Sequence, residues 1–257
     1  MELKFSKYQG TGNDFILFDD RELTFPQKTG IVQQLCDRKF GIGADGVILI
    51  QEHPSLDYRM VYFNSDGSQS LCGNGSRCGF AFAEHIGMVH EKATFETTDG
   101  IHQIYRKDGN IHFQLFDVKG LKKLNDSEWY VNTGSPHHII LSDKDLEQID
   151  LVSRGREIRN DPSYSSLNGT NVNFAQLLQD HVKIRTYERG VEDETLSCGT
   201  GATAVGLVAG NLGYNSPISI VTKGGKLQVA FKKEGEMYTE IWLSGPAENV
   251  FEGSVTI

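Results

Sequence analysis

The sequence predicts an α+β protein built from two similar halves, and three observations support this. A Cys-Gly-x-Gly motif occurs twice, at residues 72–75 and 198–201, with 126 positions between the two cysteines. Each motif opens a segment of small and apolar residues, which is typical of a buried helix. Most of the other apolar segments are rich in β-branched and aromatic residues, which favour strands.

Three further pairs of segments support an internal duplication. They occur in the same order in both halves: residues 11–13 (TGN) with 133–135 (TGS), 45–47 (DGV) with 170–172 (TNV), and 63–67 (FNSDG) with 187–190 (YERG). Their offsets of 122, 125 and 124 positions are nearly constant and close to half of the 257 residues. A repeat of this length predicts two structural units. We therefore expect an N-terminal half over residues 1–117 and a C-terminal half over residues 118–248.

Local patterns predict the individual elements in chain order. Helices are expected at residues 31–39, 80–86 and 202–212, the last of them ended by Gly213. Strands are expected at residues 46–50, 58–63, 111–116, 226–232 and 237–243. The last two strands should form a hairpin around Glu234 and Gly235. Each half then consists mostly of strands, with one dominant helix entered through a Cys-Gly-x-Gly turn.

Composition excludes several classes of function. The formal charge of −9 and the absence of a Lys/Arg-rich stretch argue against nucleic-acid binding. The first residues, MELKFSKYQG, lack the features of a signal peptide, and no apolar stretch is long enough to span a membrane. Four cysteines in a chain of this length do not form a disulfide framework, and their spacings miss the pattern of structural zinc. We therefore expect a cytoplasmic protein without a metal.

One glycine motif is misleading. Residues 41–46 (GIGADG) match the dinucleotide-binding pattern G-x-G-x-x-G. That pattern requires a strand before it and a helix after it, so that the pyrophosphate meets a helix N-terminus. Here the order is reversed, because a predicted helix precedes the motif and a predicted strand follows it. The sequence therefore gives no support for a nucleotide site.

The four cysteines fall into two classes. Cys36 and Cys78 are expected to be small buried core residues, as most free cysteines are. Cys72 and Cys198 each stand at a predicted helix start, where free backbone N–H groups favour a thiolate. The same N–H groups can bind a carboxylate. Two activated thiols and two anion sites, one from each half, predict an active site in the cleft between the halves.

Two other positions are candidates for a supporting role. His137 follows a turn, Gly-Ser-Pro, instead of interrupting an apolar segment, although a single histidine is usually structural. Glu188 and Arg189 would ordinarily be surface charges. They become candidates for the site because the repeat aligns them with the position that Asn64 holds in the other half.

Taken together, the motifs resemble those of diaminopimelate epimerases. The resemblance is carried by residues 7–15 (KYQGTGNDF), 41–46, 64–67 (NSDG), 72–75 (CGNG), 187–190 (YERG) and 198–201 (CGTG). It implies two α/β halves, each a mixed barrel-like sheet around a central helix, with the ligand between them. It also implies that residues 249–257 return to complete the first half.

The resemblance further implies the interconversion of LL- and meso-2,6-diaminopimelate without pyridoxal phosphate, metal or other cofactor. Cys72 and Cys198 would be the acid and base, and His137 and Glu188 would tune their pKa values. The remaining implied contacts are with the substrate, from Asn13, Asn64, Asn171, Glu188 and Arg189 and from the helix starts at Gly73, Asn74, Gly199 and Thr200. The expected partner is this small molecule, with no nucleic acid and no membrane, and the resemblance is compatible with a homodimer.

Two residues depart from the commonest family pattern, and two alternative functions stay open. Gly46 stands where many members have Gln, and Ser135 stands where many have Asn, so Gly46 can contribute no side chain to the site and Ser135 only a shorter one. A proline or hydroxyproline racemase also uses paired cysteines, but it favours Cys-Gly-His-Gly where this chain has Asn74, and proline offers Arg189 no distal carboxylate. A non-catalytic amino-acid-binding protein would need neither Cys72 nor Cys198.

Overall fold

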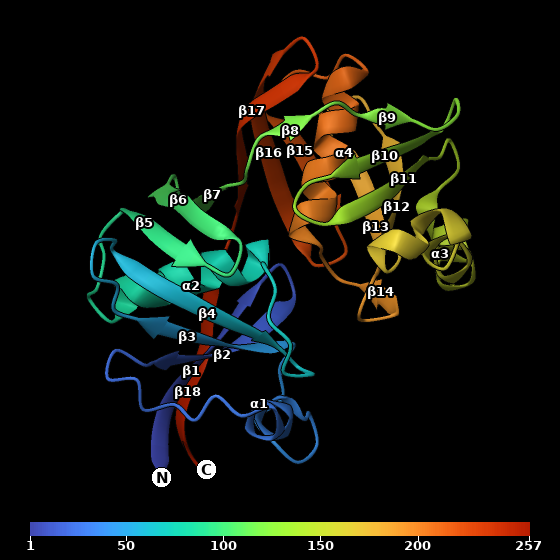
Figure 1. Cartoon of the computed structure of the whole chain (residues 1–257). Coiled ribbons are helices and arrows are strands. Elements are labelled where there is room, and N and C mark those ends of the chain that lie inside the picture. Colours follow the sequence, from blue (N-terminus) through green and yellow to red (C-terminus); the bar gives the residue numbers. More distant parts are fainter. The chain divides into compact units, whose positions relative to one another are not determined.

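The chain folds into two compact units, which a computed structural model describes over all residues 1–257. The N-terminal unit comprises Met1–Phe113 together with Gly245–Ile257, and the C-terminal unit comprises Gln114–Ser244 (Figure 1). The last strand, β18 (Glu248–Thr256), pairs antiparallel with the first strand, β1 (Glu2–Gly10). The C-terminal end of the chain is therefore part of the N-terminal unit.

The N-terminal unit continues from β1 through a mixed sheet. Its elements are β2 (Asn13–Asp19), α1 (Thr29–Cys36), β3 (Gly46–Gln51), β4 (Tyr58–Asn64), α2 (Gly73–His85), β5 (Lys92–Thr97), β6 (Gly100–Lys107) and β7 (Asn110–Gln114). Strand β2 runs parallel to β3, β3 antiparallel to β4, and β4 parallel to β5. The hairpin β5–β6 and the hairpin β6–β7 follow.

The C-terminal unit has the same plan. Its elements are β8 (Val118–Lys119), β9 (Lys122–Lys123), β10 (Glu128–Asn132), β11 (Pro136–Leu141), η1 (Leu146–Gln148), α3 (Leu151–Arg159), η2 (Pro162–Leu167), β12 (Asn171–Leu177), β13 (Val182–Glu188), β14 (Asp193–Thr195), α4 (Gly199–Asn211), β15 (Ile218–Thr222), β16 (Gly225–Glu234) and β17 (Met237–Gly245). Strand β11 runs parallel to β12, β12 antiparallel to β13, and β13 parallel to β15. The antiparallel pairs β15–β16 and β16–β17 complete the series. This repetition of pairings confirms the expected α+β duplication.

Each unit holds one helix that is buried on nearly all sides. In α2 every residue from Gly73 to Ala83 is buried, and α4 is buried from Gly201 to Ala209. Helix α2 packs against β1, β2 and β3, and α4 packs against β12, β13, β15 and β16. Small side chains permit this close approach: at Gly206 an added Cβ would lie 2.9 Å from the Cβ of Val229. A sheet wrapped around a small-residue helix is therefore the core of each unit.

The predicted elements are mostly present, with shifted ends. Helices α2 and α4 begin directly after the cysteines, seven and three residues earlier than the predicted starts at 80 and 202. Gly, Asn and Ser have low intrinsic helix propensity, so the first turns are helical because of burial. Helix α1 spans Thr29–Cys36 instead of 31–39, since the Asp37 carboxylate accepts hydrogen bonds from the N–H groups of Lys39 and Phe40 and forms a turn there. Strand β7 ends at Gln114, two residues before the predicted end.

The glycine motif that resembles a dinucleotide site follows a helix and leads into a strand, as the sequence predicts. Residues 41–45 lie between α1 and β3, and β3 begins at Gly46, so a strand follows the motif and not a helix. The predicted hairpin is also present, as β16 and β17 pair around Glu234 and Met237. None of the helices combines the length and the apolar character that crossing a membrane would need.

Candidate active site

Cys72 is the residue that starts helix α2. Its backbone is extended (φ −132°, ψ 110°), and the N–H of Gly75 donates to its Sγ over 3.3 Å. The sulfur thus takes the place of a capping oxygen at a helix N-terminus, where backbone N–H groups have no partner within the helix. Its side chain is partly exposed, whereas Gly73 and Asn74 behind it are buried.

Asn13, the first residue of β2, connects Cys72 to Asp45, which lies directly before β3. Its Oδ1 lies 3.5 Å from Cys72 Sγ and accepts from Asn74 Nδ2 at 3.3 Å. Its Nδ2 donates to the carboxylate of Asp45 at 2.5 Å. Three of the predicted site residues are therefore brought together, and Asp45 joins them as a residue that the sequence had not singled out.

Arg77 supports this group from inside the helix. Its side chain is fully buried, and it donates to Asn74 Oδ1 at 2.9 Å, to Gly73 O at 3.4 Å and to Pro246 O at 3.3 Å. All three acceptors are uncharged carbonyl oxygens. Burial lowers the pKa of Arg77, while the nearby Cys78 and Cys72 act in the opposite direction. Its position three residues after Asn74 in a helix is the only sequence signal that could have indicated it.

Asn64 is the last residue of β4, and its side chain forms hydrogen bonds within the turn that follows. Its Nδ2 donates to Ser68 O, Ser68 Oγ and Ser70 Oγ, each at 3.1 Å. It makes no hydrogen bond to Asn13 or Cys72. Its predicted contact with substrate therefore stays a prediction.

Cys198 starts helix α4 in the C-terminal unit, as Cys72 does for α2. Its side chain is 6% exposed, and its Sγ lies 3.6 Å from Thr200 Oγ1. That hydroxyl lies 3.0 Å from Nε2 of His137. Burial, reinforced by the positive charge of Arg189, lowers the pKa of His137 to about 3. His137 is therefore neutral near pH 7, and its connection to Cys198 passes through Thr200.

Asn171 connects the next group of predicted residues. Its Nδ2 donates to Ser135 Oγ at 2.8 Å and to Pro136 O at 2.9 Å, and its Oδ1 accepts from the N–H of Arg189 at 3.0 Å. The shorter side chain of Ser135 thus still reaches a neighbour in the site. One guanidinium nitrogen of Arg189 donates to Leu167 O at 2.7 Å, which orients the side chain.

Glu188 is held by the short strand that follows it. Its Oε2 accepts from Thr195 Oγ1 at 2.7 Å. Strand β13 ends at this glutamate, and the antiparallel pairing with β14 sets it opposite Asp193. Its predicted influence on the thiols stays a prediction.

Gly46, the other departure from the family pattern, has a packing explanation. A Cβ at this position would lie 2.4 Å from Phe63 O and 2.5 Å from the ring of Tyr62. The Tyr62 ring also meets Phe15 edge-on, with 5.8 Å between the ring centroids. The space that a side chain at position 46 would need is therefore filled by Tyr62.

The other two cysteines lie in the core, as expected. Cys78 is fully buried and Cys36 is 5% exposed. Burial raises the pKa of Cys36 to about 12 and raises that of Cys78 as well. Both thiols are therefore protonated near pH 7 and poorly suited to proton transfer.

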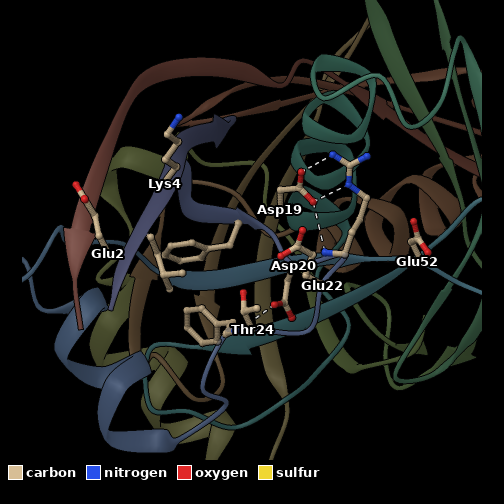
Figure 2. A pocket seen from close by; sticks show the side chains of 11 residues that line it. Glu2, Lys4, Asp19, Asp20, Glu22, Thr24 and Glu52 are labelled. Atoms are coloured by element: carbon tan, nitrogen blue, oxygen red, sulfur yellow. Dashed lines mark hydrogen bonds and ion pairs between the residues drawn. The ribbon is translucent and has the colours of Figure 1, made fainter.

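No three His, Cys, Asp or Glu side chains are arranged to hold a metal ion. A surface hollow of about 680 Å³ lies in the N-terminal unit, and neither Cys72 nor Cys198 is among the residues that line it (Figure 2). Its charged lining is mainly acidic, with Glu2, Asp19, Asp20, Glu22 and Glu52 against Lys4 and Arg21. Asp19 is already paired with Arg21 at 2.5 Å. This hollow contains none of the predicted site residues.

Comparison with known sequences places the chain among its relatives. The profile of the family "Diaminopimelate epimerase" matches residues 5–116 and 129–250. A diaminopimelate epimerase from Flavobacterium psychrophilum is 47% identical over 259 residues, which cover 98% of this chain and 100% of the relative. The enzyme of the same name from Aquifex aeolicus is 37% identical, with 99% and 98% covered.

Solved structures share the fold at much lower identity. A phenazine biosynthesis protein of the PhzF family from Bacillus anthracis matches with a TM-score of 0.79 at 17% identity, with both chains fully covered. A probable proline racemase from Agrobacterium radiobacter matches with a TM-score of 0.71 at 16% identity, with 99% of this chain and 93% of that chain covered. These two likenesses establish the fold alone. The sequence matches over nearly the whole chain establish that it belongs to the diaminopimelate epimerase family.

Proposed function

We propose that this chain interconverts LL- and meso-2,6-diaminopimelate, a step in the synthesis of lysine and peptidoglycan precursors. The family membership and the 47% identity to a diaminopimelate epimerase support this activity. The observation that carries the mechanism is that Cys72 and Cys198 each occupy the N-cap position of a buried helix in its own unit.

The two thiols account for the proton transfers. Epimerisation removes a very weakly acidic α-proton from one face of the carbon and delivers a proton to the opposite face. One cysteine acts as a thiolate base and the other as a thiol acid, and the roles exchange for the reverse reaction. The two thiols supply the base and the acid that the exchange of one α-proton requires, so the proposed mechanism routes no proton through pyridoxal phosphate or a metal.

The helix starts bind the carboxylate next to the reacting carbon. The N–H groups at Gly73 and Asn74 and those at Gly199 and Thr200 have no acceptor within their helices. They stabilise the α-carboxylate and the negative charge that grows there when the proton leaves.

The remaining polar residues bind the distal end of the substrate in this proposal. Arg189 is suited to the distal carboxylate because its guanidinium can donate two parallel hydrogen bonds. The other residues in this role are Asn13, Asn64, Asn171 and Glu188. His137 and Glu188 adjust the two thiols.

A proline racemase is the second candidate, because a probable proline racemase shares the fold. Asn74 in the first cysteine motif and Arg189 favour diaminopimelate, since proline has no distal carboxylate for an arginine to bind. Incubating the purified protein with LL-diaminopimelate or with L-proline in heavy water separates the two. Deuterium at the α-carbon of diaminopimelate alone supports the proposal, and deuterium in proline alone refutes it.

Replacing the cysteines tests the assignment directly. Cys72→Ala and Cys198→Ala should each lower the epimerisation rate by about 10²-fold or more, because each direction needs both an acid and a base. Cys36→Ala is the matched control, since Cys36 is buried in the core of the N-terminal unit. It should retain the rate of the parent protein. Full activity of either Cys72→Ala or Cys198→Ala would remove that cysteine from the mechanism.

The proposed reaction places the protein in the cytoplasm, where precursors of lysine and peptidoglycan are made. A homodimer is the assembly that we propose on the basis of the family resemblance. Light scattering on the purified protein at several concentrations measures its mass, and a mass of one chain throughout would refute the dimer.

A further inference from the structure

A connected series of polar side chains, in which Asn173 and His137 are fully buried, leads to Cys198. Asn173, in the middle of β12, is fully buried, and its Nδ2 lies 3.1 Å from Nδ1 of His137. His137 Nε2 lies 3.0 Å from Thr200 Oγ1, which lies 3.6 Å from Cys198 Sγ. Four side chains therefore form one connected path that ends at the sulfur.

The orientation of the Asn173 amide is set by two neighbours. Its Nδ2 also faces the backbone carbonyl of His138 at 3.4 Å, and a carbonyl can only accept. Its Oδ1 receives a hydrogen bond from Thr186 Oγ1 at 3.0 Å. The NH₂ group of Asn173 therefore points at His137, and Nδ1 of that imidazole must be the acceptor.

The direction of the remaining hydrogen bonds follows from this. A neutral imidazole that accepts at Nδ1 carries its proton on Nε2. His137 then donates from Nε2 to Thr200 Oγ1, and the Thr200 hydroxyl keeps its own proton for Cys198 Sγ. Since a hydrogen bond to the charged form of a group favours that form, this path favours the thiolate of Cys198.

We propose that Asn173 is a positioning residue that holds His137 in the Nε2–H tautomer and thereby directs the Thr200 hydroxyl proton at Cys198. This inference rests on the proposed role of Cys198. It assigns His137 a donor role through Thr200, with no proton gained or lost by the imidazole. The neutral state that burial imposes on His137 agrees with this role.

The fold provides room for this arrangement in one unit only. A Cβ at Gly201 would lie 2.4 Å from Asn173 Oδ1, so the second glycine of the Cys-Gly-Thr-Gly motif lets α4 approach the amide. The strand register pairs His137 with Asn171 as it pairs Phe15 with Gly46, and therefore equates Asn173 with Ile48. The unit that carries Cys72 thus has apolar residues where the unit that carries Cys198 has His137 and Asn173.

The tautomer can be measured without any substrate. In the full-length protein with ¹⁵N-labelled histidine, NMR should show a pyridine-type Nδ1 and a pyrrole-type Nε2 for His137. Asn173→Asp keeps the shape but turns the NH₂ donor into an acceptor, so Nδ1 should become pyrrole-type. Thr203→Val is the matched control, since it removes a buried hydroxyl of α4 that donates to Gly199 O. It should leave both signals of His137 unchanged.

Kinetics provide the second readout. Asn173→Asp should lower kcat roughly 10- to 100-fold, the range found when the partner that orients a metal-bound histidine is removed. Its KM should change by less than about twofold, because Asn173 does not touch the substrate. Thr200→Val should lower kcat further than Thr200→Ser does, since only serine keeps the hydroxyl that bridges His137 and Cys198.

The results that overturn the inference are separate from those that overturn the proposed function. A pyrrole-type Nδ1 or a charged imidazole for His137 in the parent protein contradicts the inference, whatever the substrate is. So does an Asn173→Asp variant with unchanged kcat, or a Thr200→Ser variant as impaired as Thr200→Val. Full activity of Cys198→Ala instead contradicts the proposed function. Because the parent protein alone decides the tautomer, the test does not depend on the folding of any variant.

Discussion

The buried guanidinium of Arg77 donates to the side-chain oxygen of Asn74 over 2.9 Å. This bond turns the NH₂ group of Asn74 toward Asn13, whose own NH₂ group faces the carboxylate of Asp45. Because Arg77 can only donate and the Asp45 carboxylate only accepts, both amides between them have a fixed orientation. Asn13 therefore presents an acceptor to Cys72, whereas Thr200 presents a donor to Cys198.

Replacing Arg77 tests its role behind Cys72. Arg77→Met should leave the buried Asn74 Oδ1 without its arginine donor, at about 1–3 kcal/mol, and should also remove the side-chain hydrogen bonds to Gly73 O and Pro246 O, while the removal of a buried charge offsets part of this cost. We expect the free energy of unfolding in urea to fall by about 2 kcal/mol. Alkylation of Cys72 should also slow, since the cation that favours its thiolate is lost. Alkylation of Cys198 in the same sample is the control, and unchanged behaviour of both cysteines would contradict this role.

Enlarging Gly201 tests the close approach of α4 to β12. Gly201→Ala places a Cβ 2.4 Å from Asn173 Oδ1, which forces the amide or the helix start to move. We expect a loss of stability of about 1–3 kcal/mol, typical of overpacking, together with a lower kcat. Gly30→Ala is the control, because no atom lies within 4 Å of the added Cβ in helix α1. It should stabilise the protein by up to about 1 kcal/mol. Equal effects of the two substitutions would count against the close approach.

The lowered pKa of Asp14 predicts how the stability of the fold depends on pH. Burial alone would raise its pKa, but hydrogen bonds from Arg38 and Lys7 outweigh burial and lower the pKa to about 2. A carboxyl with a folded pKa below its unfolded value of 3.8 stabilises the fold fully above that value. The contribution, about 2 kcal/mol, disappears as the pH falls through about 2.

The measurement is the free energy of unfolding between pH 5 and pH 2 for the parent protein and for Asp14→Asn. The variant should lose less stability over this range because it lacks the titrating group. If the free energy of unfolding falls equally steeply with decreasing pH in both proteins, the ion pairs of Asp14 with Lys7 and Arg38 do not stabilise the fold.

Arg189→Lys separates recognition from chemistry. Lysine keeps the charge but loses the fork that suits a carboxylate, so KM for diaminopimelate should rise. The charge-assisted hydrogen bonds at stake are worth roughly 1.5–3 kcal/mol, which corresponds to a roughly 10- to 100-fold change in kcat/KM. Steady-state kinetics measure both constants. An unchanged KM would mean that Arg189 is a surface charge held by Leu167.

The sequence predicted those features that depend on repetition and on local pattern. The two Cys-Gly-x-Gly motifs located both cysteines at helix starts, and the segments around them predicted the two halves. The helical range predicted at residues 80–86 leaves out the first turns of α2, because their residues favour turns in isolation and only burial inside the sheet makes them helical.

The residues behind the cysteines could not be predicted. Asn173 reaches His137 because β11 and β12 run parallel in one particular register, and a sequence pattern does not specify that register. Arg77 would ordinarily be expected on the surface, since a fully buried arginine is rare without a charged partner. Its role depends in part on the carbonyl group of Pro246, which lies 169 positions further along the chain.

The central claim is that two different thiols serve the two faces of the α-carbon, and heavy water tests it most directly. LL-diaminopimelate is incubated with the protein in D₂O, and early samples of substrate and product are analysed by mass spectrometry. If Cys72 and Cys198 act as separate acid and base, the meso product should carry solvent deuterium from the first turnovers while the remaining LL substrate carries little. Product without deuterium at early times would show that a single base returns the proton it removed, and would contradict the two-thiol account.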